Sequence, residues 1–359
     1  MKIRTVFRFV KSVIILLLIA FIVFVLFSAI TKYRPQDVKL LESNDKPTIL
    51  SDTATVELLT WNTGYSSLGD DAGGFNIFGG ISRTAVERIL QNYYQINEYL
   101  KTNRHKDFIL LQRVDKNSRR SFNINALDSL KQLFSASSII YGNNFNVRLV
   151  PFPPFGHVNS GIVTISNSEP FIAERHSYPG NYPALKSLFY KQRCYTLSRY
   201  QVENGRELVI INTHNSKPDY ENLLKKQTNH IKKILNEEYN KGNYVIAGGT
   251  WNISPPGFEP DFFFNRFETV NVYFPGDNLE DWQWAYDKNV PTKRRLDKPY
   301  NPAETLTTLV DYFIVSPNIK VIDVEGVHLD FKYSDHNPVK IKARLLGDKT
   351  IKPVEYIER

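Results

Sequence analysis

Five polar segments, each beside an apolar run with strand-like character, carry the side-chain types that hydrolytic chemistry uses. They are Trp61-Asn62, Asn212-Thr213-His214-Asn215, Gly249-Thr250-Trp251-Asn252, Asp311 and Ser334-Asp335-His336-Asn337. Histidine and aspartate can move a proton or orient one another, and asparagine can hold an oxyanion. A lone histidine near a strand end is usually part of the core or the surface. Five such segments together are harder to assign to packing, because ligands bind in crevices at strand ends.

Residues 247–252 show which group such a site lacks. The apolar run 244–247 leads into two glycines, a threonine, a tryptophan and an asparagine. This pattern predicts a buried strand whose end delivers polar side chains to a cleft. Hydrolytic sites of this shape usually place an aspartate where Thr250 stands, and a threonine hydroxyl is no base near neutral pH. Whether the chain is an enzyme depends largely on this position and one other.

In their order along the chain, these motifs resemble the endonuclease/exonuclease/phosphatase superfamily. The resemblance covers about residues 55–345 and rests on Trp61-Asn62, Leu111-Gln112-Arg113-Val114-Asp115, Asn212-Thr213-His214, Gly248-Gly249-Thr250-Trp251-Asn252, Asp311-Tyr312 and Ser334-Asp335-His336. It implies an α/β four-layer sandwich, with two mixed β-sheets face to face and helices outside. It also implies hydrolysis of phosphodiesters or phosphomonoesters of nucleic acids, sphingolipids or inositides with a divalent cation, usually Mg²⁺.

The resemblance implies a role for each matching side chain. Asn62 would help to bind the metal or the phosphate, His214 would stabilise the transition state, and Asn252 would orient the nucleophile or the phosphoryl oxygens. His336 would lie against the scissile phosphate, and Asp311 would hold its ring in place.

Two positions depart from the family pattern. The family's Leu-Gln-Glu motif supplies the glutamate that binds magnesium, and here that position is Arg113. The family's Gly-Asp-x-Asn motif supplies an aspartate that positions the attacking water, and here it is Thr250. Mg²⁺ requires oxygen ligands, whereas a permanently charged guanidinium repels the ion. Asp335, which would stand beside the metal, and Asn62 are the candidate ligands if a metal binds at all. The two substitutions predict a catalytically impaired protein.

Three functions stay open at this point. In the first, the cleft binds phosphate through the Arg113 fork without cleaving it, unless Arg113 pairs with Asp335 or Asp115 and only stabilises the domain. In the second, an active phosphodiesterase or phosphatase holds Mg²⁺ with relocated carboxylates such as Asp70, Asp71, Asp115 or Asp335. In the third, the chain is a structural envelope protein, and its histidines would not come together at one site. The phosphate-containing ligand could be a lipid headgroup, a nucleic acid or a soluble phosphate ester.

The N-terminus predicts a membrane anchor. Four basic residues, Lys2, Arg4, Arg8 and Lys11, precede residues 13–30, which contain no charge. As a helix this run spans roughly 27 Å, close to the thickness of a bilayer core. The excess of positive charge before it predicts a cytoplasmic N-terminus and an extracytoplasmic main domain. A cleaved signal peptide is the alternative, but the apolar run is longer than a usual h-region and shows no evident small-x-small cleavage site.

The rest of the sequence predicts one α/β domain between a stalk and a tail. We expect a basic segment at 1–12, a transmembrane anchor at 13–30, a polar stalk at 31–54, the domain at 55–345 and a polar tail at 346–359. Helical periodicity marks residues 84–100 and 221–239, and strand-like runs lie between and after them. The net charge of +8 suits either an anionic partner or a solvated surface, and the single Cys194 excludes an intramolecular disulfide.

Overall fold

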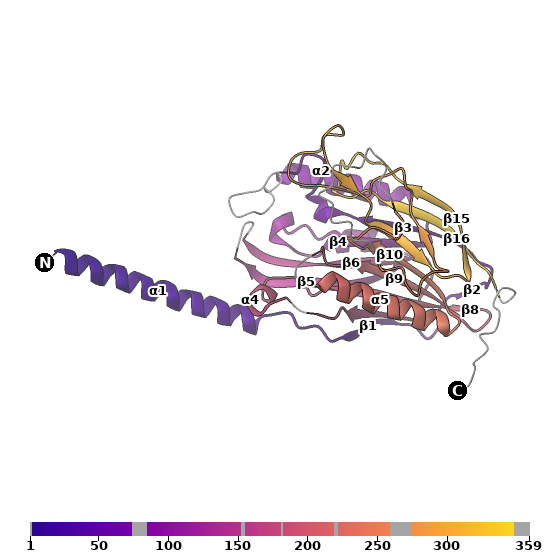
Figure 1. Cartoon of the computed structure of the whole chain (residues 1–359), viewed down its shortest axis with the longest axis horizontal. Coiled ribbons are helices and arrows are strands. Elements are labelled where there is room, and N and C mark those ends of the chain that lie inside the picture. Colours follow the sequence, from indigo (N-terminus) through magenta and orange to yellow (C-terminus); the bar gives the residue numbers. More distant parts are fainter. Residues whose placement is uncertain are drawn as a thin grey trace.

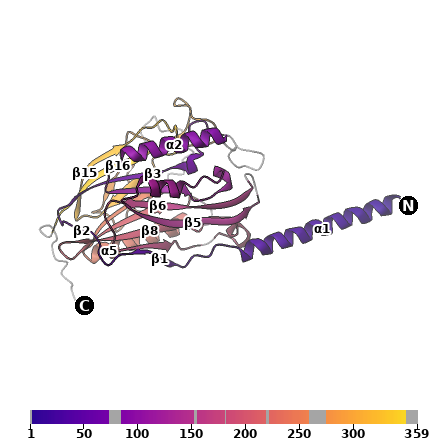
Figure 2. The same cartoon turned by 180° about the vertical axis from the view of Figure 1, so that it is seen from behind.

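The computed structural model describes residues 2–73, 85–151, 155–180, 182–218, 222–258 and 274–347, so positions 348–359 of the expected tail lie outside the described residues. Two mixed β-sheets pack face to face with helices on their outer sides, and a long N-terminal helix projects from the sandwich (Figures 1 and 2). The expected fold class is confirmed.

The larger sheet has eight strands in the order β1-β7-β8-β9-β10-β14-β11, with β2 paired to β8. Its bounds are β1 Val38–Ser43, β2 Ile49–Leu50, β7 Ile172–Ser177, β8 Cys194–Val202, β9 Glu207–His214, β10 Tyr244–Thr250, β11 Gln283–Ala285 and β14 Asp311–Val315. β9 and β10 are parallel, whereas β14 runs antiparallel to β10.

The second sheet has six strands in the order β15-β16-β3-β4-β6-β5. Its bounds are β3 Thr55–Asn62, β4 Phe108–Asp115, β5 Ser138–Val150, β6 Gly156–Ser166, β15 Ile319–Gly326 and β16 Val339–Leu345. β3 and β4 are parallel, and β16 runs antiparallel to β3. A separate two-stranded ribbon consists of β12 Lys293–Arg294 and β13 Thr307–Thr308.

Side chains that alternate along the strands divide most of the apolar core into three layers, one between the sheets and one on the outer face of each sheet. Leu110 of β4 and Ile246 of β10 belong to the cluster between the two sheets. The next side chain along β4, Leu111, points the other way, toward helices α2 (Val86–Thr102) and α3 (Ala126–Leu133). In the same way, Val245 packs under helix α5 (Leu223–Asn240). Because successive strand residues face opposite sides, each central strand is apolar on both faces.

The expected stalk is shorter than residues 31–54. β1 lies in this range and pairs antiparallel with β7, and β2 pairs parallel with β8. β1 is a half-exposed edge strand, so its sequence lacks the alternation of apolar and polar residues that marks a strand buried on one face. Residues 31–37 therefore form the whole connection between the N-terminal helix and the sheet.

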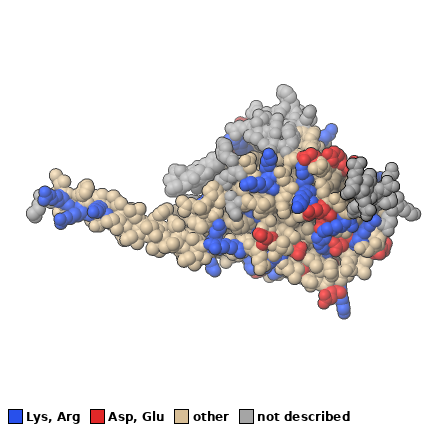
Figure 3. All heavy atoms as spheres, turned by 60° about the horizontal axis from the view of Figure 1, so that its bottom comes forward, with Lys and Arg blue, Asp and Glu red and all other residues tan. Residues whose placement is uncertain are grey.

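Helix α1 (Lys2–Ile30) includes the basic segment as well as the apolar run. Within the described residues it is the one helix long and apolar enough to cross a membrane, and an 18-residue stretch of it has a mean hydropathy of 3.4. Figure 3 shows basic side chains at its far end and again where it meets the domain, with an uncharged stretch between. At that junction Phe24 stacks on Phe189, with ring centroids 5.5 Å apart, beside the short helix α4 (Ala184–Ser187).

Gly249 allows β10 to approach β9 closely just before Thr250. Its φ of +141° lies in the region that favours glycine, and a Cβ added there would lie 2.1 Å from the Thr213 carbonyl oxygen. Any other residue would therefore push the two strands apart at the point where they deliver their last side chains.

We predict that Gly249→Ala destabilises the fold by about 3 kcal/mol or more, because overpacking against backbone adds to the strained φ. The matched control is Gly205→Ala, whose φ is +79° but whose added Cβ has nothing within 4 Å. This variant should lose about 1 kcal/mol, from the strained φ alone. Urea unfolding of both variants measures the difference, and equal losses would contradict the close-contact explanation.

Candidate functional site

Strand direction brings the polar segments to one edge of the sandwich. Asn62 and Gln112 are partners at the ends of the parallel pair β3 and β4. His214 and Thr250 are partners at the ends of the parallel pair β9 and β10. Because β14 is antiparallel to β10, its first residue, Asp311, lies opposite Thr250. Segments far apart in sequence therefore converge at this edge, which we call the central site.

Alternation also decides which way these side chains point. Residues two apart on a strand share a face, so Gln112 continues the face of Leu110, and Thr250 continues the face of Ile246. The space between the sheets thus changes from apolar to polar at its edge. Hydrogen bonds cross it, among them one from Asn62 Nδ2 to Thr250 Oγ1 at 2.8 Å and one from Gln112 Nε2 to Asn212 Oδ1 at 2.9 Å.

His336 and Asp311 form a buried pair, as the family resemblance implied. His336 Nδ1 lies 2.7 Å from Asp311 Oδ2, and Thr250 Oγ1 donates to the other carboxylate oxygen at 2.5 Å. Burial lowers the pKa of His336, although the Asp311 carboxylate acts in the opposite direction. His336 Nε2 has no hydrogen-bond partner among the described residues. The ring is therefore oriented, and its Nε2 lies 3.7 Å from Asp335 Oδ2, too far for a hydrogen bond. The catalytic role of His336 remains a prediction.

Arg113 pairs with Asp335, not with Asp115. Its Nη1 donates to both oxygens of Asp335, at 2.8 and 2.9 Å, and both side chains are buried. Burial alone would raise the pKa of Asp335, but the charge and hydrogen bonds of Arg113, together with the charges of His336 and Lys293, hold that pKa well below its usual range. Arg113 adopts a left-handed φ of 57° at an irregularity in the β4–β6 pairing, which turns its side chain toward Asp335. Of the two partners that the sequence left open for Arg113, the structure therefore has Asp335.

The described residues do not fit a Mg²⁺ site. Both oxygens of Asp335 accept hydrogen bonds from Arg113, and the amide oxygen of Asn62 accepts one from the Gly64 backbone at 3.3 Å. No group of three or more His, Cys, Asp or Glu side chains that could hold a metal occurs in the described part of the chain. Since magnesium depends on free carboxylate oxygens, these two candidate ligands do not provide its donor set.

The relocated ligands considered from the sequence are also engaged by arginine. Arg88 forms ion pairs with Asp70 and Asp71. Arg120 Nη2 donates to Asp115 at 2.8 Å, and Ser121 also donates to that carboxylate. Each of these carboxylates is therefore already paired with an arginine, and Asp70 and Asp71 share theirs.

His214 and Asn252 lie at the same site. His214 ends β9 and is buried, and its Nε2 has no partner among the described residues. Burial, followed by the charges of Arg193 and Lys191, lowers the pKa of His214 well below its usual value. Asn252 Nδ2 donates to the Asn215 carbonyl at 2.7 Å. All eight candidate residues, which are Asn62, Arg113, His214, Thr250, Asn252, Asp311, Asp335 and His336, therefore belong to this strand-end edge.

Sequence reasoning missed three of the basic side chains around this centre, Lys191, Arg193 and Lys217. The fourth, Lys293, belongs to the run Lys293-Arg294-Arg295, for which the sequence offers either a polyanion surface or, in preference, a solvated loop. Lys191 and Arg193 precede β8, Lys217 follows β9, and Lys293 of β12 donates from Nζ to Asn252 Oδ1 at 3.0 Å. Burial, and then neighbouring basic groups that include Arg113, lower the pKa values of all three lysines. Isolated basic residues in loops carry no pattern of their own. Of the three missed residues, only Lys217 had a signal in the sequence, because it lies three residues after His214, the last residue of β9.

No protein-family model matches this chain, and no curated protein matches it by sequence. Several solved structures share its fold. An endonuclease/exonuclease/phosphatase from Beutenbergia cavernae DSM 12333 has 14% identity and a TM-score of 0.53, covering 81% of this chain and 72% of that chain. ANGEL2, a 2′,3′-cyclic phosphatase in complex with adenosine-2′,3′-vanadate, has 13% identity and a TM-score of 0.51, covering 85% of this chain and 100% of that chain. The human Nocturnin catalytic domain with bound sulfate anion has 12% identity and a TM-score of 0.51, covering 84% of this chain and 96% of that chain.

We predict that Arg113 and Asp335 are strongly coupled in stability. Arg113→Met or Asp335→Asn alone should each cost about 3–5 kcal/mol, because each leaves a buried group of the pair without its partner. The double variant should cost clearly less than the sum of the single variants. Denaturant unfolding of all four proteins measures the coupling, and costs that simply add would contradict it.

The pH dependence of this coupling has a defined sign. Because the pKa of Asp335 is lower in the folded protein than in the unfolded chain, the folding stability that this carboxylate contributes is complete above its unfolded pKa of about 4. It should decline as the pH falls from there toward the folded pKa.

Proposed function

We propose that this chain, which has the fold of the endonuclease/exonuclease/phosphatase superfamily, is a membrane-anchored, catalytically impaired protein that binds phosphate-containing ligands without a divalent cation. The Arg113–Asp335 ion pair is the observation that carries the impairment. It places a permanent positive charge beside the carboxylate that would otherwise stand next to the metal. Because this pair engages the Arg113 guanidinium, the proposed phosphate binding rests instead on nitrogen atoms of the central site that have no partner among the described residues.

The hydrogen bonds of Thr250 support impairment. Its hydroxyl donates to Asp311 and accepts from Asn62, so it is held in place where the family pattern has an aspartate. A neutral hydroxyl cannot take the proton of an attacking water at neutral pH. Loss of one such catalytic group costs on the order of a hundredfold or more in rate, and Arg113 removes a second one.

Unpartnered nitrogen atoms support phosphate binding. Arg113 Nε, His214 Nε2 and His336 Nε2 are buried without a hydrogen-bond partner among the described residues. Buried polar atoms normally have partners, and oxygen atoms of a phosphate would supply them. Lys293 and Lys217 add further donors around the same centre. The vanadate adduct of ANGEL2 and the sulfate of Nocturnin are oxyanions held by proteins of this fold, which makes phosphate the first ligand to test.

Membrane anchoring is supported by α1 and by the charges around it. Arg4, Arg8 and Lys11 lie before the apolar stretch, whereas Lys32 and Arg34 follow it. This asymmetry favours a cytoplasmic N-terminus and an extracytoplasmic domain. In that location a lipid headgroup, an extracellular nucleic acid or a soluble phosphate ester could each supply the phosphate.

The competing function is a working phosphodiesterase or phosphatase. The observation in its favour is the His336–Asp311 pair, whose geometry suits proton transfer. The convergence of both histidines on one edge argues against a purely structural envelope protein, whose cleft would lack such contacts.

We predict no hydrolysis of bis(p-nitrophenyl) phosphate or p-nitrophenyl phosphate by the full chain in detergent with Mg²⁺ or Mn²⁺. The double variant Arg113→Glu, Thr250→Asp should gain turnover, because it restores a second carboxylate beside Asp335 and a base at the end of β10. Adding His336→Ala to this variant should abolish the gain. Turnover by the natural protein that stops on metal chelation would overturn the impaired-site proposal.

We predict that the natural protein binds inorganic phosphate in the presence of EDTA, measured by isothermal titration calorimetry. Lys293→Gln should weaken binding about tenfold, the scale of one charge-assisted hydrogen bond. The matched control is Lys320→Gln, which removes one exposed charge on β15 and should leave the affinity nearly unchanged. Absence of binding, or equal losses in both variants, would contradict metal-free phosphate recognition.

A further inference from the structure

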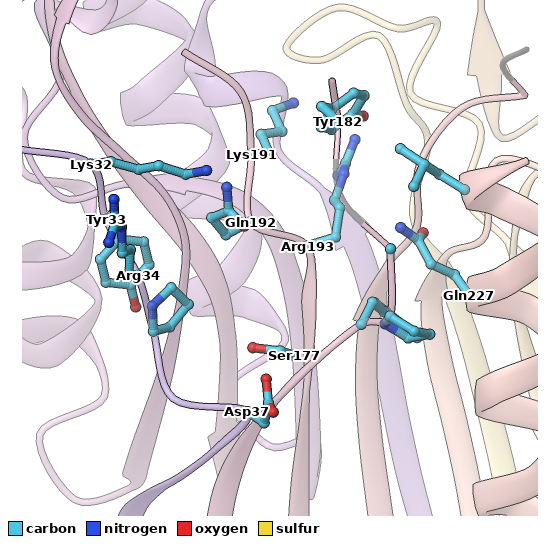
Figure 4. A pocket seen from close by; sticks show the side chains of 15 residues that line it. Lys32, Tyr33, Arg34, Asp37, Ser177, Tyr182, Lys191, Gln192, Arg193 and Gln227 are labelled. Atoms are coloured by element: carbon cyan, nitrogen blue, oxygen red, sulfur yellow. The ribbon is translucent and has the colours of Figure 1, made fainter. Parts of the chain in front are cut away.

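A cavity of about 360 Å³ lies where the connection from α1 meets the domain, and we call it the junction cavity. Lys32 and Arg34 line it from the connection, and Lys191 and Arg193 line it from the segment before β8. Figure 4 shows these side chains around the cavity, with Asp37 and Ser177 at its other end. Its volume falls in the range of small-ligand pockets, which is about 300–1,000 Å³.

The junction cavity carries more positive than negative charge. Four basic residues line it against one acidic residue, Asp37. Within the described part of the chain, no carboxylate forms an ion pair with any of the four. Lys32 Nζ donates to Ser187 Oγ at 2.8 Å, and Arg193 Nη1 donates to the His214 carbonyl at 3.1 Å. Both side chains are thus held by neutral acceptors, and their positive charges have no carboxylate partner among the described residues.

Two of the nitrogen donors that line the junction cavity also lack a hydrogen-bond acceptor among the described residues. Arg193 Nε is buried without a partner among the described residues. Lys191 lies near the faces of Tyr65 and Phe145, with Nζ 5.5 and 5.8 Å from the ring centroids, and no acceptor oxygen contacts it in the described structure. A group with several acceptor oxygens and a negative charge would satisfy these donors together. A phosphate group has this chemistry.

The position of the cavity indicates where the phosphate would come from. Lys32 follows the last residue of α1 by two positions. The end of α1 is fixed to the domain by the Phe24–Phe189 stack and by the Lys32–Ser187 hydrogen bond. With the apolar part of α1 in a bilayer, the cavity therefore lies at the level of the lipid headgroups.

We infer that the junction cavity binds the phosphate headgroup of an anionic membrane lipid, with Lys32, Arg34, Lys191 and Arg193 as its donors. This inference uses the membrane placement proposed above, but not the phosphate binding proposed for the central site. Lipid binding at this position would fix the orientation of the domain relative to the membrane surface.

The test uses the full chain in detergent, titrated with phosphatidylglycerol or phosphatidylcholine and observed by native mass spectrometry. Phosphatidylglycerol should bind more tightly, because the choline cation would meet four basic groups. Lys32→Gln and Arg193→Gln should each weaken phosphatidylglycerol binding about tenfold, the effect expected for one charged hydrogen bond. Soluble sn-glycerol 3-phosphate, titrated in parallel, tests the other source of the same phosphate chemistry.

Two control variants distinguish lipid binding in the junction cavity from general attraction between basic residues and anionic lipid. Lys39→Gln removes an exposed charge on β1 near the connection but outside the cavity, and Arg8→Gln removes one at the far end of α1. Both should change the affinity less than twofold.

Three results would overturn the inference. They are equal binding of the two lipids, equal effects of cavity and control variants, and binding of glycerol phosphate as tight as that of the lipid. Co-sedimentation with vesicles is measured separately. Failure to co-sediment refutes the membrane placement itself, whereas co-sedimentation without a preference for phosphatidylglycerol refutes the junction cavity alone.

Discussion

Face-to-face packing of the two sheets is the constraint on which the rest of the structure depends. Side chains that alternate along the central strands fill the space between the sheets with apolar groups such as Leu110 and Ile246. The same alternation continues to the strand ends, where Gln112 and Thr250 occupy the corresponding positions. The polar site is therefore an extension of the core, and its geometry is as well defined as the packing behind it.

At this edge, one buried ion pair changes the chemistry that the site can support. Arg113 and Asp335 neutralise one another where a divalent cation would need free carboxylate oxygens. The pair is worth little net stability compared with an apolar replacement, but breaking it is costly. Such a site resists gradual return to metal binding, because changing Arg113 to glutamate leaves the buried Asp335 carboxylate without its partner.

The basic groups of the central site and the junction cavity form one continuous electrostatic region. Arg193 links them, because it lines the cavity and donates to the carbonyl of His214. Burial and mutual repulsion lower the pKa of Lys191, so an anion bound at either place would relieve this repulsion. The two proposed sites are therefore expected to influence one another's affinity for anions.

The sequence by itself indicated strands β3, β4, β6, β8, β9, β10, β14 and β16, the principal helices and the candidate site residues, but not β5, β7 or β15. Local alternation and short motifs are properties of neighbouring residues and can therefore be recognised without the fold. The sequence also flagged Arg113 and Thr250 as departures. It did not reveal β1, because a half-exposed edge strand has no strong pattern. Whether Arg113 would meet Asp335 or Asp115, and which loop lysines would gather around His214, was decided by tertiary structure. The Arg113–Asp335 contact joins residues 222 positions apart, and only strand order and register bring them together.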